Sequence, residues 1–156
     1  MSEPVSTPPA LAGSAFARLV RAALEQLRGA AVSQHLFRNR ARVIPKDMPT
    51  AVVVRLQSAD ADMAAGSGAL SLWDVVLVVE CYARTALGCE MEDALDELTL
   101  QVTSALLQDR TLGGVVADLA LARLQWDFDA DGERTGCAIA TFVVRQAVPP
   151  AGINPL

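Results

Sequence analysis

The chain has 156 residues, of which 52% are hydrophobic and 20% charged, and its net charge at pH 7 is −5. This length fits one domain that buries about two-thirds of its unfolded surface, and the composition excludes a disordered chain. The negative charge argues against a protein that coats nucleic acid non-specifically, because such binding comes mostly from Lys and Arg neutralising phosphates.

Cysteine usage and hydropathy indicate the compartment. The chain has three cysteines, an odd number, and they are widely spaced at Cys81, Cys89 and Cys137. No CxxC motif occurs. We therefore expect free thiols in a reducing compartment such as a cytoplasm.

The longest strongly apolar run, residues 75–79, is far shorter than the roughly 20 residues of a membrane span. Glu3 stands where a signal peptide would be basic, so the sequence predicts a soluble protein without a membrane partner.

Proline placement predicts the domain limits. Three prolines within residues 1–11 indicate a flexible N-terminal arm over residues 1–12. A single domain is expected over residues 13–148. Pro149-Pro150 then ends the regular structure, which leaves residues 149–156 as a C-terminal tail.

The first predicted helix covers residues 14–28. Its apolar residues recur at intervals of three and four, which places them on one face. Ser14 can cap the start of the helix, and Gly29 can end it. The apolar stripe consists of Phe16, Leu19, Val20, Ala23, Leu24 and Leu27.

Two strands are predicted next. Residues 36–44 alternate, so that Arg38, Arg40 and Arg42 share one side of an extended chain. Pro45 and Pro49 break this strand, and residues 51–57 form a second, β-branched one. Residues 58–70 have little apolar bulk, which indicates a mobile loop or the tip of a long hairpin.

Residues 72–84 give the strongest strand signal. One side is entirely apolar and should pack on the helices. The other side is mixed, which is typical of a half-exposed face or an interface. The apolar side carries Trp73, Val75, Leu77, Val79 and Cys81, and the mixed side carries Leu72, Asp74, Val76, Val78, Glu80 and Tyr82.

A second helix is predicted over residues 90–108, with Gly113-Gly114 beyond its end. Five acids lie in its first half, where negative charge favours the positive end of the helix dipole. They are Glu90, Glu92, Asp93, Asp96 and Glu97. Residues 117–128 and 134–148 then form a hairpin whose turn contains Asp131-Gly132.

The predicted fold is therefore α+β, with the element order α-β-β-β-α-β-β. A mixed, mostly antiparallel sheet of about five strands, with two helices on one face, suits this order, because each helix then buries one stripe and the sheet one side.

No set of residues favours catalysis, a metal or a cofactor. His35 is the only histidine and lies in a predicted turn. Cys89 is near a helix start, which would lower its pKa, but the acids that follow it act in the opposite direction. Glu92 and Asp96 are one helical turn apart, as on many solvated helix faces. The expected protein is not an enzyme, and we expect it to carry no catalytic residue, metal ligand or cofactor.

The arginine stripe at positions 38, 40 and 42 is the most unusual charge feature. It fits an exposed strand face, a contact with a neighbouring subunit, or a contact with DNA phosphates. A subunit contact would pair these arginines with the five acids of the second helix. Basic and acidic surfaces on one molecule favour head-to-tail contacts, which close into rings or extend as filaments.

Three segments carry a resemblance to a known family. They are FRNRARVIP at residues 37–45, WDVVLVVE at 73–80 and DRTLGGVVAD at 109–118. In this order, and with the two amphipathic helices, they resemble the tail terminator proteins of long-tailed bacteriophages. That family is also called tail-completion or minor tail protein U-like, and the resemblance runs from about residue 14 to 147.

The resemblance implies a structural virion protein at the head-proximal end of the tail, assembled in the host cytoplasm. It implies a homohexameric ring that caps the tail tube, stops its polymerisation and offers a joining surface to a head-side connector protein. Genomic DNA would pass through the ring without specific binding. Two alternatives stay open: a head-tail connector or other tail structural protein, and a small bacterial enzyme or ligand-binding domain.

Overall fold

The computed structural model describes residues 14–39, 45, 47–64, 70–84, 90–128 and 135–149. Within these residues the predicted α+β class and the order α-β-β-β-α-β-β are confirmed. The predicted arm over residues 1–12 and the tail beyond Pro149 lie outside the described residues. The elements are α1 (Ala15–Gly29), β1 (Leu36–Arg38), β2 (Thr50–Ala61), β3 (Ser71–Arg84), α2 (Met91–Gln108), β4 (Asp118–Phe128) and β5 (Thr135–Val148).

The five strands form one sheet in the order β1-β2-β3-β5-β4. β1 pairs with β2 in parallel and the other neighbours are antiparallel, which confirms a mixed, mostly antiparallel sheet. Register shifts occur between Leu56 and Ser58 in β2 and between Leu121 and Arg123 in β4. β5 thus occupies the interior of the sheet, between β3 and β4.

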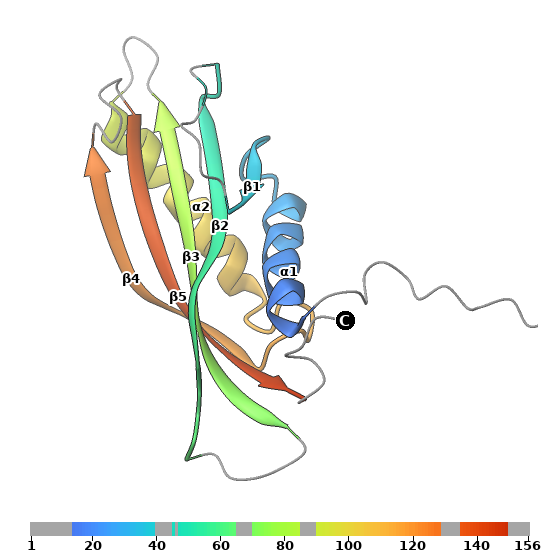
Figure 1. Ribbon diagram of the computed structural model, residues 1–156. Helices are drawn as coiled ribbons and strands as arrows, with labels where there is room; N and C mark the ends of the chain where they lie inside the picture. Colours follow the sequence, from blue (N-terminus) through green and yellow to red (C-terminus); the bar gives the residue numbers. More distant parts are fainter. Residues whose placement is uncertain are drawn as a thin grey trace, which may run out of the picture.

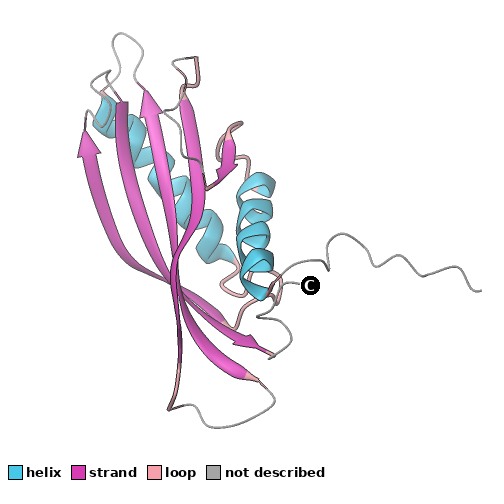
Figure 2. Cartoon of the chain, in the orientation of Figure 1, coloured by secondary structure: helices cyan, strands magenta, loops and turns pink. Residues whose placement is uncertain are grey.

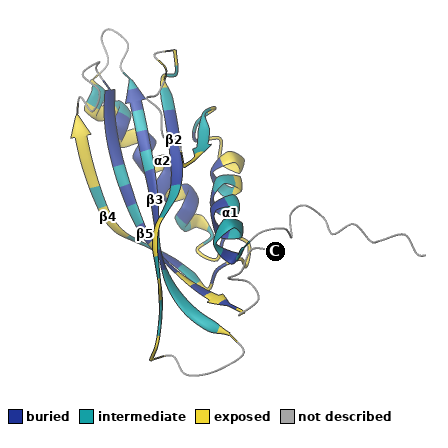
Figure 3. Ribbon diagram, viewed as in Figure 1, coloured by how far each residue is buried: buried dark blue, intermediate teal, exposed yellow. Residues whose placement is uncertain are grey.

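Both helices cover the same face of the sheet (Figures 1 and 2). α1 contacts β1 and β2, whereas α2 contacts β3, β5 and β4. Gly136 in β5 permits the close approach of α2, because an added Cβ would lie 3.0 Å from Leu95 Cδ2. Figure 3 shows the buried residues concentrated on β3, β5 and the inner sides of the helices.

The two sides of β3 differ as predicted. Val75, Leu77 and Val79 are fully buried against the helices. Trp73, on the same side, packs edge-on against Phe16 of α1 with ring centroids 5.6 Å apart. The opposite side faces away from the helices and is partly exposed at Glu80 and other positions.

The predicted strand over residues 36–44 is wrong in its length within the described part of the chain. β1 ends at Arg38, and the backbone φ of Asn39 is 49°, in the left-handed region. Asn tolerates this conformation better than most residues, and a left-handed residue ends an extended ladder. Residues 40–44, including Arg40 and Arg42, lie outside the described residues.

The predicted loop over residues 58–70 is also partly wrong. Residues 58–61 continue β2 beyond its register shift, and Ala61 pairs with Trp73. The hairpin alternative was therefore the better one. These small and polar residues form a strand because β3 offers them a complete ladder of partners, which outweighs their weak intrinsic preference for strands.

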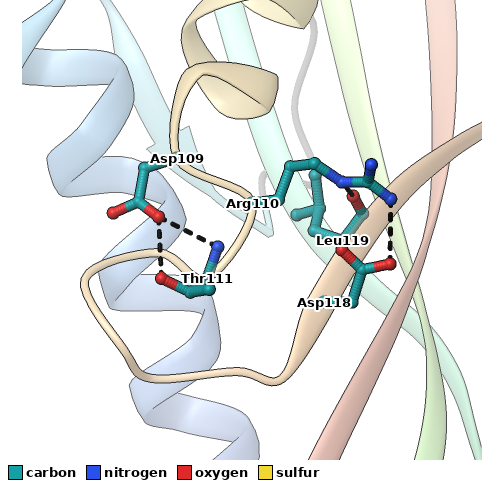
Figure 4. A network of polar contacts seen from close by, with 5 residues as sticks. All are labelled: Asp109, Arg110, Thr111, Asp118 and Leu119. Carbon is teal, nitrogen blue, oxygen red and sulfur yellow. Dashed lines mark hydrogen bonds and ion pairs between the residues drawn. The ribbon is translucent and has the colours of Figure 1, made fainter.

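Polar contacts fix the helix ends. Ser14 accepts a hydrogen bond from Ala17 N, which confirms the predicted cap. Beyond α2, the Asp109 carboxylate accepts bonds from Thr111 N and Thr111 Oγ1 (Figure 4). It also accepts a bond from Gly113 N. α2 already ends at Gln108, and Gly113 and Gly114, with φ values of 70° and 86°, lie in the turn that follows it.

Candidate functional site

His35 and the two described cysteines form no reactive set within the described residues. His35 stacks on Phe37, with ring centroids 6.5 Å apart. Burial raises the pKa of Cys81 to about 12 and that of Cys137 to about 11, so both thiols stay protonated at neutral pH. Cys89 lies outside the described residues. In the described part of the chain, no group of three or more His, Cys, Asp or Glu residues could hold a metal ion.

A small polar network lies on the sheet face that the helices leave open. Arg55 Nε donates to Glu80 Oε1 at 3.1 Å, and Tyr82 Oη donates to Glu80 Oε2 at 3.0 Å. Burial, and then the nearby acidic groups, raise the pKa of Tyr82, so the phenol keeps its proton. A satisfied set of this kind stabilises the sheet and leaves no reactive group.

The acids of α2 contribute to a surface hollow. Glu92, Asp93 and Asp96 line it from the helix, and Trp126 and Phe128 line it from β4. We call this the acidic-aromatic hollow; its volume is about 320 Å³. The two rings are 49% and 46% exposed, and the described residues supply no ion pair to the three carboxylates. Apolar surface and unpaired negative charge therefore occur together at this site.

The other two predicted acids do not line this hollow. Glu90 is the N-cap residue of α2, where its carbonyl accepts a bond from Ala94 N. Glu97 is exposed and accepts a bond from Gln101 Nε2 at 3.4 Å. Negative charge near a helix N-terminus is favourable in itself, which gives Glu90 a structural role, whereas Glu97 lies beyond the first turn of α2.

Arg38 lies at the opposite edge of the sheet. Together with Asn39 and Arg55 it lines a smaller hollow of about 110 Å³ between β1, β2 and α1. Arg55 pairs with Glu80, whereas no acid of the described residues pairs with Arg38. The structure thus brings Arg38 and Arg55 together, and it does not place Arg40 or Arg42.

The strand registers put the start of β1 level with the acidic-aromatic hollow, whereas Arg38 is in the row of Leu124, which does not line it. Leu36 of β1 is paired with Val52, Val52 with Cys81, Cys81 with Ala138, and Ala138 with Trp126. One row of residues therefore crosses the whole sheet from β1 to the acidic-aromatic hollow. Arg38 lies two residues further along β1, on the same side of the sheet as Leu36, because side chains alternate along a strand.

Sequence reasoning named the acids but missed their aromatic partners. Alternation along the predicted strand over residues 117–128 places Trp126 and Phe128 on one side of it, and the structure agrees, since both line the hollow. The available signal was the alternation itself, which continues apolar to the end of β4 (Leu124, Trp126, Phe128). It could not show that α2 presents carboxylates to these rings in place of apolar side chains.

Within the described residues, no helix is both long and apolar enough to cross a lipid bilayer. No protein-family model matches the chain, and no curated protein matches it.

Two solved structures are similar in fold. One is the PVC sheath/tube terminator of an extracellular contractile injection system in its extended state, with 12% identity and a TM-score of 0.46. That similarity covers 94% of this chain and 62% of the terminator chain, so this chain spans less than two thirds of its length. The other is a chain from the virion of the native gene transfer agent particle, with 16% identity, a TM-score of 0.45, and coverage of 83% and 94%. Neither likeness supplies a residue-by-residue correspondence.

Proposed function

We propose that this chain is a structural subunit of a phage-type tail that assembles head-to-tail into a closed hexameric ring. The ring caps the tail tube, stops its polymerisation and joins the tube to a head-side connector protein. It occupies the head-proximal end of the tail in the virion, after assembly in the host cytoplasm. DNA passes through its channel without specific binding, and the chain has no enzymatic activity, cofactor or metal.

The resemblance of the sequence to tail terminators supports the role, and one structural observation supports the ring. The basic edge at β1 and the acidic-aromatic hollow at β4 lie on opposite edges of one sheet. Unlike surfaces on opposite sides of a subunit form heterologous contacts. Heterologous contacts of this kind generate a ring when the rotation between neighbouring subunits closes.

Charge supplies the expected pairing. Arg38, Arg40 and Arg42 of one subunit would meet Glu92, Asp93 and Asp96 of the next, with Glu90 and Glu97 at the rim. Such pairs fix register and partner choice more than they add affinity. The overall negative charge also suits a channel wall that repels DNA phosphate.

The first experiment measures the mass of the particle in solution by light scattering, and its shape by negative-stain electron microscopy. We expect closed single-layer rings that cap purified tail tubes. A lone subunit at all concentrations, or stacked tubes, would contradict the proposal. Stacked tubes would favour a tube-like protein, and rings that bind only head-side proteins would favour a connector.

The second experiment reverses charge on the basic edge. Arg40→Glu with Arg42→Glu should shift the particles to smaller masses without changing the circular dichroism spectrum. Arg28→Glu is the control, because this exposed arginine in the last turn of α1 belongs to neither proposed surface. An unchanged particle mass in the double variant would count against the salt-bridged contact.

A further inference from the structure

The segment that joins α2 to β4 is held in one shape by its own hydrogen bonds. The amides of Gly114 and Val116 both donate to the Thr111 carbonyl at 3.0 Å. The backbone φ of Leu112 is 50°, in the left-handed region, which is rare for a bulky side chain. Strained backbone of this kind persists only where the surrounding contacts impose it. The segment therefore presents a fixed surface.

This shape leaves one apolar side chain outside. Leu112 and Val116 are buried, whereas Val115 is 36% exposed. An exposed apolar side chain needs no explanation by itself. Val115, however, lines a hollow that the segment forms with α1, so a partner can contact it from more than one side.

The α1 hollow, as we call it, has a volume of about 340 Å³. Arg18, Arg21, Ala22 and Glu25 line it from α1, and Val115 lines it from the segment. Ala22 and Val115 make part of the lining apolar, and the hydrocarbon stems of the two arginines add to it. The hollow is large enough for one bulky apolar side chain.

The two walls of the α1 hollow are fixed to each other. Gln26 Nε2 of α1 donates to the carbonyls of Ala105 and Asp109 at 2.8 and 3.1 Å, and Figure 4 shows the segment beside α1. The hollow is therefore preformed, so a partner that enters it does not have to order it first.

Charge selects the partner. Arg18 and Arg21 are one turn apart on α1, and the charge of Glu25 is offset by its ion pair with Arg28. The hollow is thus basic on a chain whose net charge is −5. A guanidinium carries five N–H donors, so each arginine can bind a carboxylate and still keep a contact within its own chain.

The α1 hollow is separate from the two sheet edges proposed for the ring. The smaller hollow at β1 includes Val20 of α1. Val20 is two residues from both Arg18 and Ala22, which is about half a helical turn, so it lies on the opposite side of α1. In a ring joined through β1 and β4, the α1 hollow is therefore available to a different protein.

We infer that the α1 hollow docks a different protein, which inserts one bulky apolar side chain against Ala22 and Val115 and places carboxylates on Arg18 and Arg21. The apolar lining favours a protein over a nucleic acid, because a phosphate backbone would use the arginines and leave Val115 exposed. The inference goes beyond the proposed ring and does not depend on it.

Synthetic peptides test the chemistry of this partner. The probe is a capped peptide with one leucine between pairs of glutamates, and methyl NMR of the whole chain follows Val115. We expect a saturable shift of the Val115 methyl signals. Replacing the leucine by alanine, or the glutamates by lysines, should weaken binding by about tenfold. No shift with the first peptide, or equal affinity for all three, would overturn the inference.

Charge reversal gives a test that loss of folding cannot imitate. In the variant Arg18→Glu, Arg21→Glu the preference should switch, so that the lysine peptide binds more tightly than the glutamate peptide. Val115→Asp should abolish binding of the glutamate peptide to the wild-type arginines. Leu100→Asp, at an exposed apolar position of α2, is the control and should leave binding unchanged. An unswitched preference in the double variant would overturn the inference.

Assembly separates this inference from the ring proposal. Val115→Asp should form particles of wild-type mass, and smaller particles would show that the α1 hollow is a subunit contact instead. Peptide binding as expected in a chain that forms no rings would support the inference and count against the proposed function. A short DNA duplex that shifts Val115 more strongly than the glutamate peptide would assign the hollow to nucleic acid and overturn the inference.

Discussion

The two halves of β4 share one apolar side of the strand, yet the side chains of the first half are buried in the core and those of the second half are exposed. Leu119, in the first half, is fully buried in the same hydrophobic cluster as Leu112 and Val116 of the segment that follows α2. Trp126, in the second half, faces carboxylates and stays half exposed. The alternation of a strand therefore indicates which side can be buried, whereas the neighbouring element determines whether it is.

The largest expected effect on stability comes from shortening a buried side chain in the first half of β4. Leu119→Ala removes a fully buried side chain and should lower the free energy of unfolding by about 3 kcal/mol, from lost burial and the cavity left behind. Urea denaturation measures the change. A loss below about 0.5 kcal/mol would mean that the first half of β4 is no more buried than the second.

A smaller effect on stability is expected from removing the hydrogen bonds that hold the end of α2. Gln26 Nε2 of α1 donates to the carbonyls of Ala105, Leu106 and Asp109 at 2.8–3.1 Å, which satisfies the C-terminal end of α2. Gln26→Ala should cost about 1–2 kcal/mol in thermal or urea unfolding. Gln101→Ala, at an exposed position of α2, is the control and should cost little.

Acidic pH should remove a further contribution to stability, which comes from the segment that follows α2. Hydrogen bonds from Thr111 Oγ1, then from Gly113 N and Thr111 N, lower the pKa of Asp109 below its usual 3.8. The folded state thus favours the carboxylate, and this stabilisation is present above pH 3.8 and lost as the pH falls through the lowered pKa. Asp109→Asn should be less stable at pH 7, and the difference should shrink on acidification. A difference that grows in acid would show that another group is responsible.

The smallest effect on stability is expected at the exposed end. Trp126→Ala should change the free energy of unfolding by no more than about 0.5 kcal/mol, because its ring is 49% exposed and the partner that would cover it is another molecule. The same variant should impair assembly strongly. A loss of several kcal/mol in the isolated subunit would show that Trp126 belongs to the core, and the comparison of the two halves would fail.

Local patterns predicted the elements well where one periodicity dominated. The apolar stripe of α1 and the two sides of β3 are found as expected, since burial there follows directly from spacing. The extension of β2 through Ala61 was missed because its residues carry no strand signal of their own and depend on pairing with β3. The end of β1 was missed because the left-handed Asn39 interrupts an otherwise regular alternation.

The candidate site was predictable in its charges and not in its geometry. The acids of α2 and Arg38 were visible in the sequence, but their positions on opposite edges depend on the strand order. That order places β5, the last strand of the chain, between β3 and β4, and no local pattern encodes it. The hollow likewise requires two elements about 30 residues apart, Glu92 to Asp96 and Trp126 to Phe128, to meet in space.

The interior position of β5 also bears on how the protein is made. While a ribosome is still completing Thr135–Val148, β3 has an unpaired edge and β4 has no partner in the sheet. Nascent chains short of this strand expose edges that invite aggregation. Folding of the sheet must therefore wait for Thr135–Val148, and this long-range pairing predicts a slow step. A subunit competent for assembly would thus emerge only after this strand has left the ribosome.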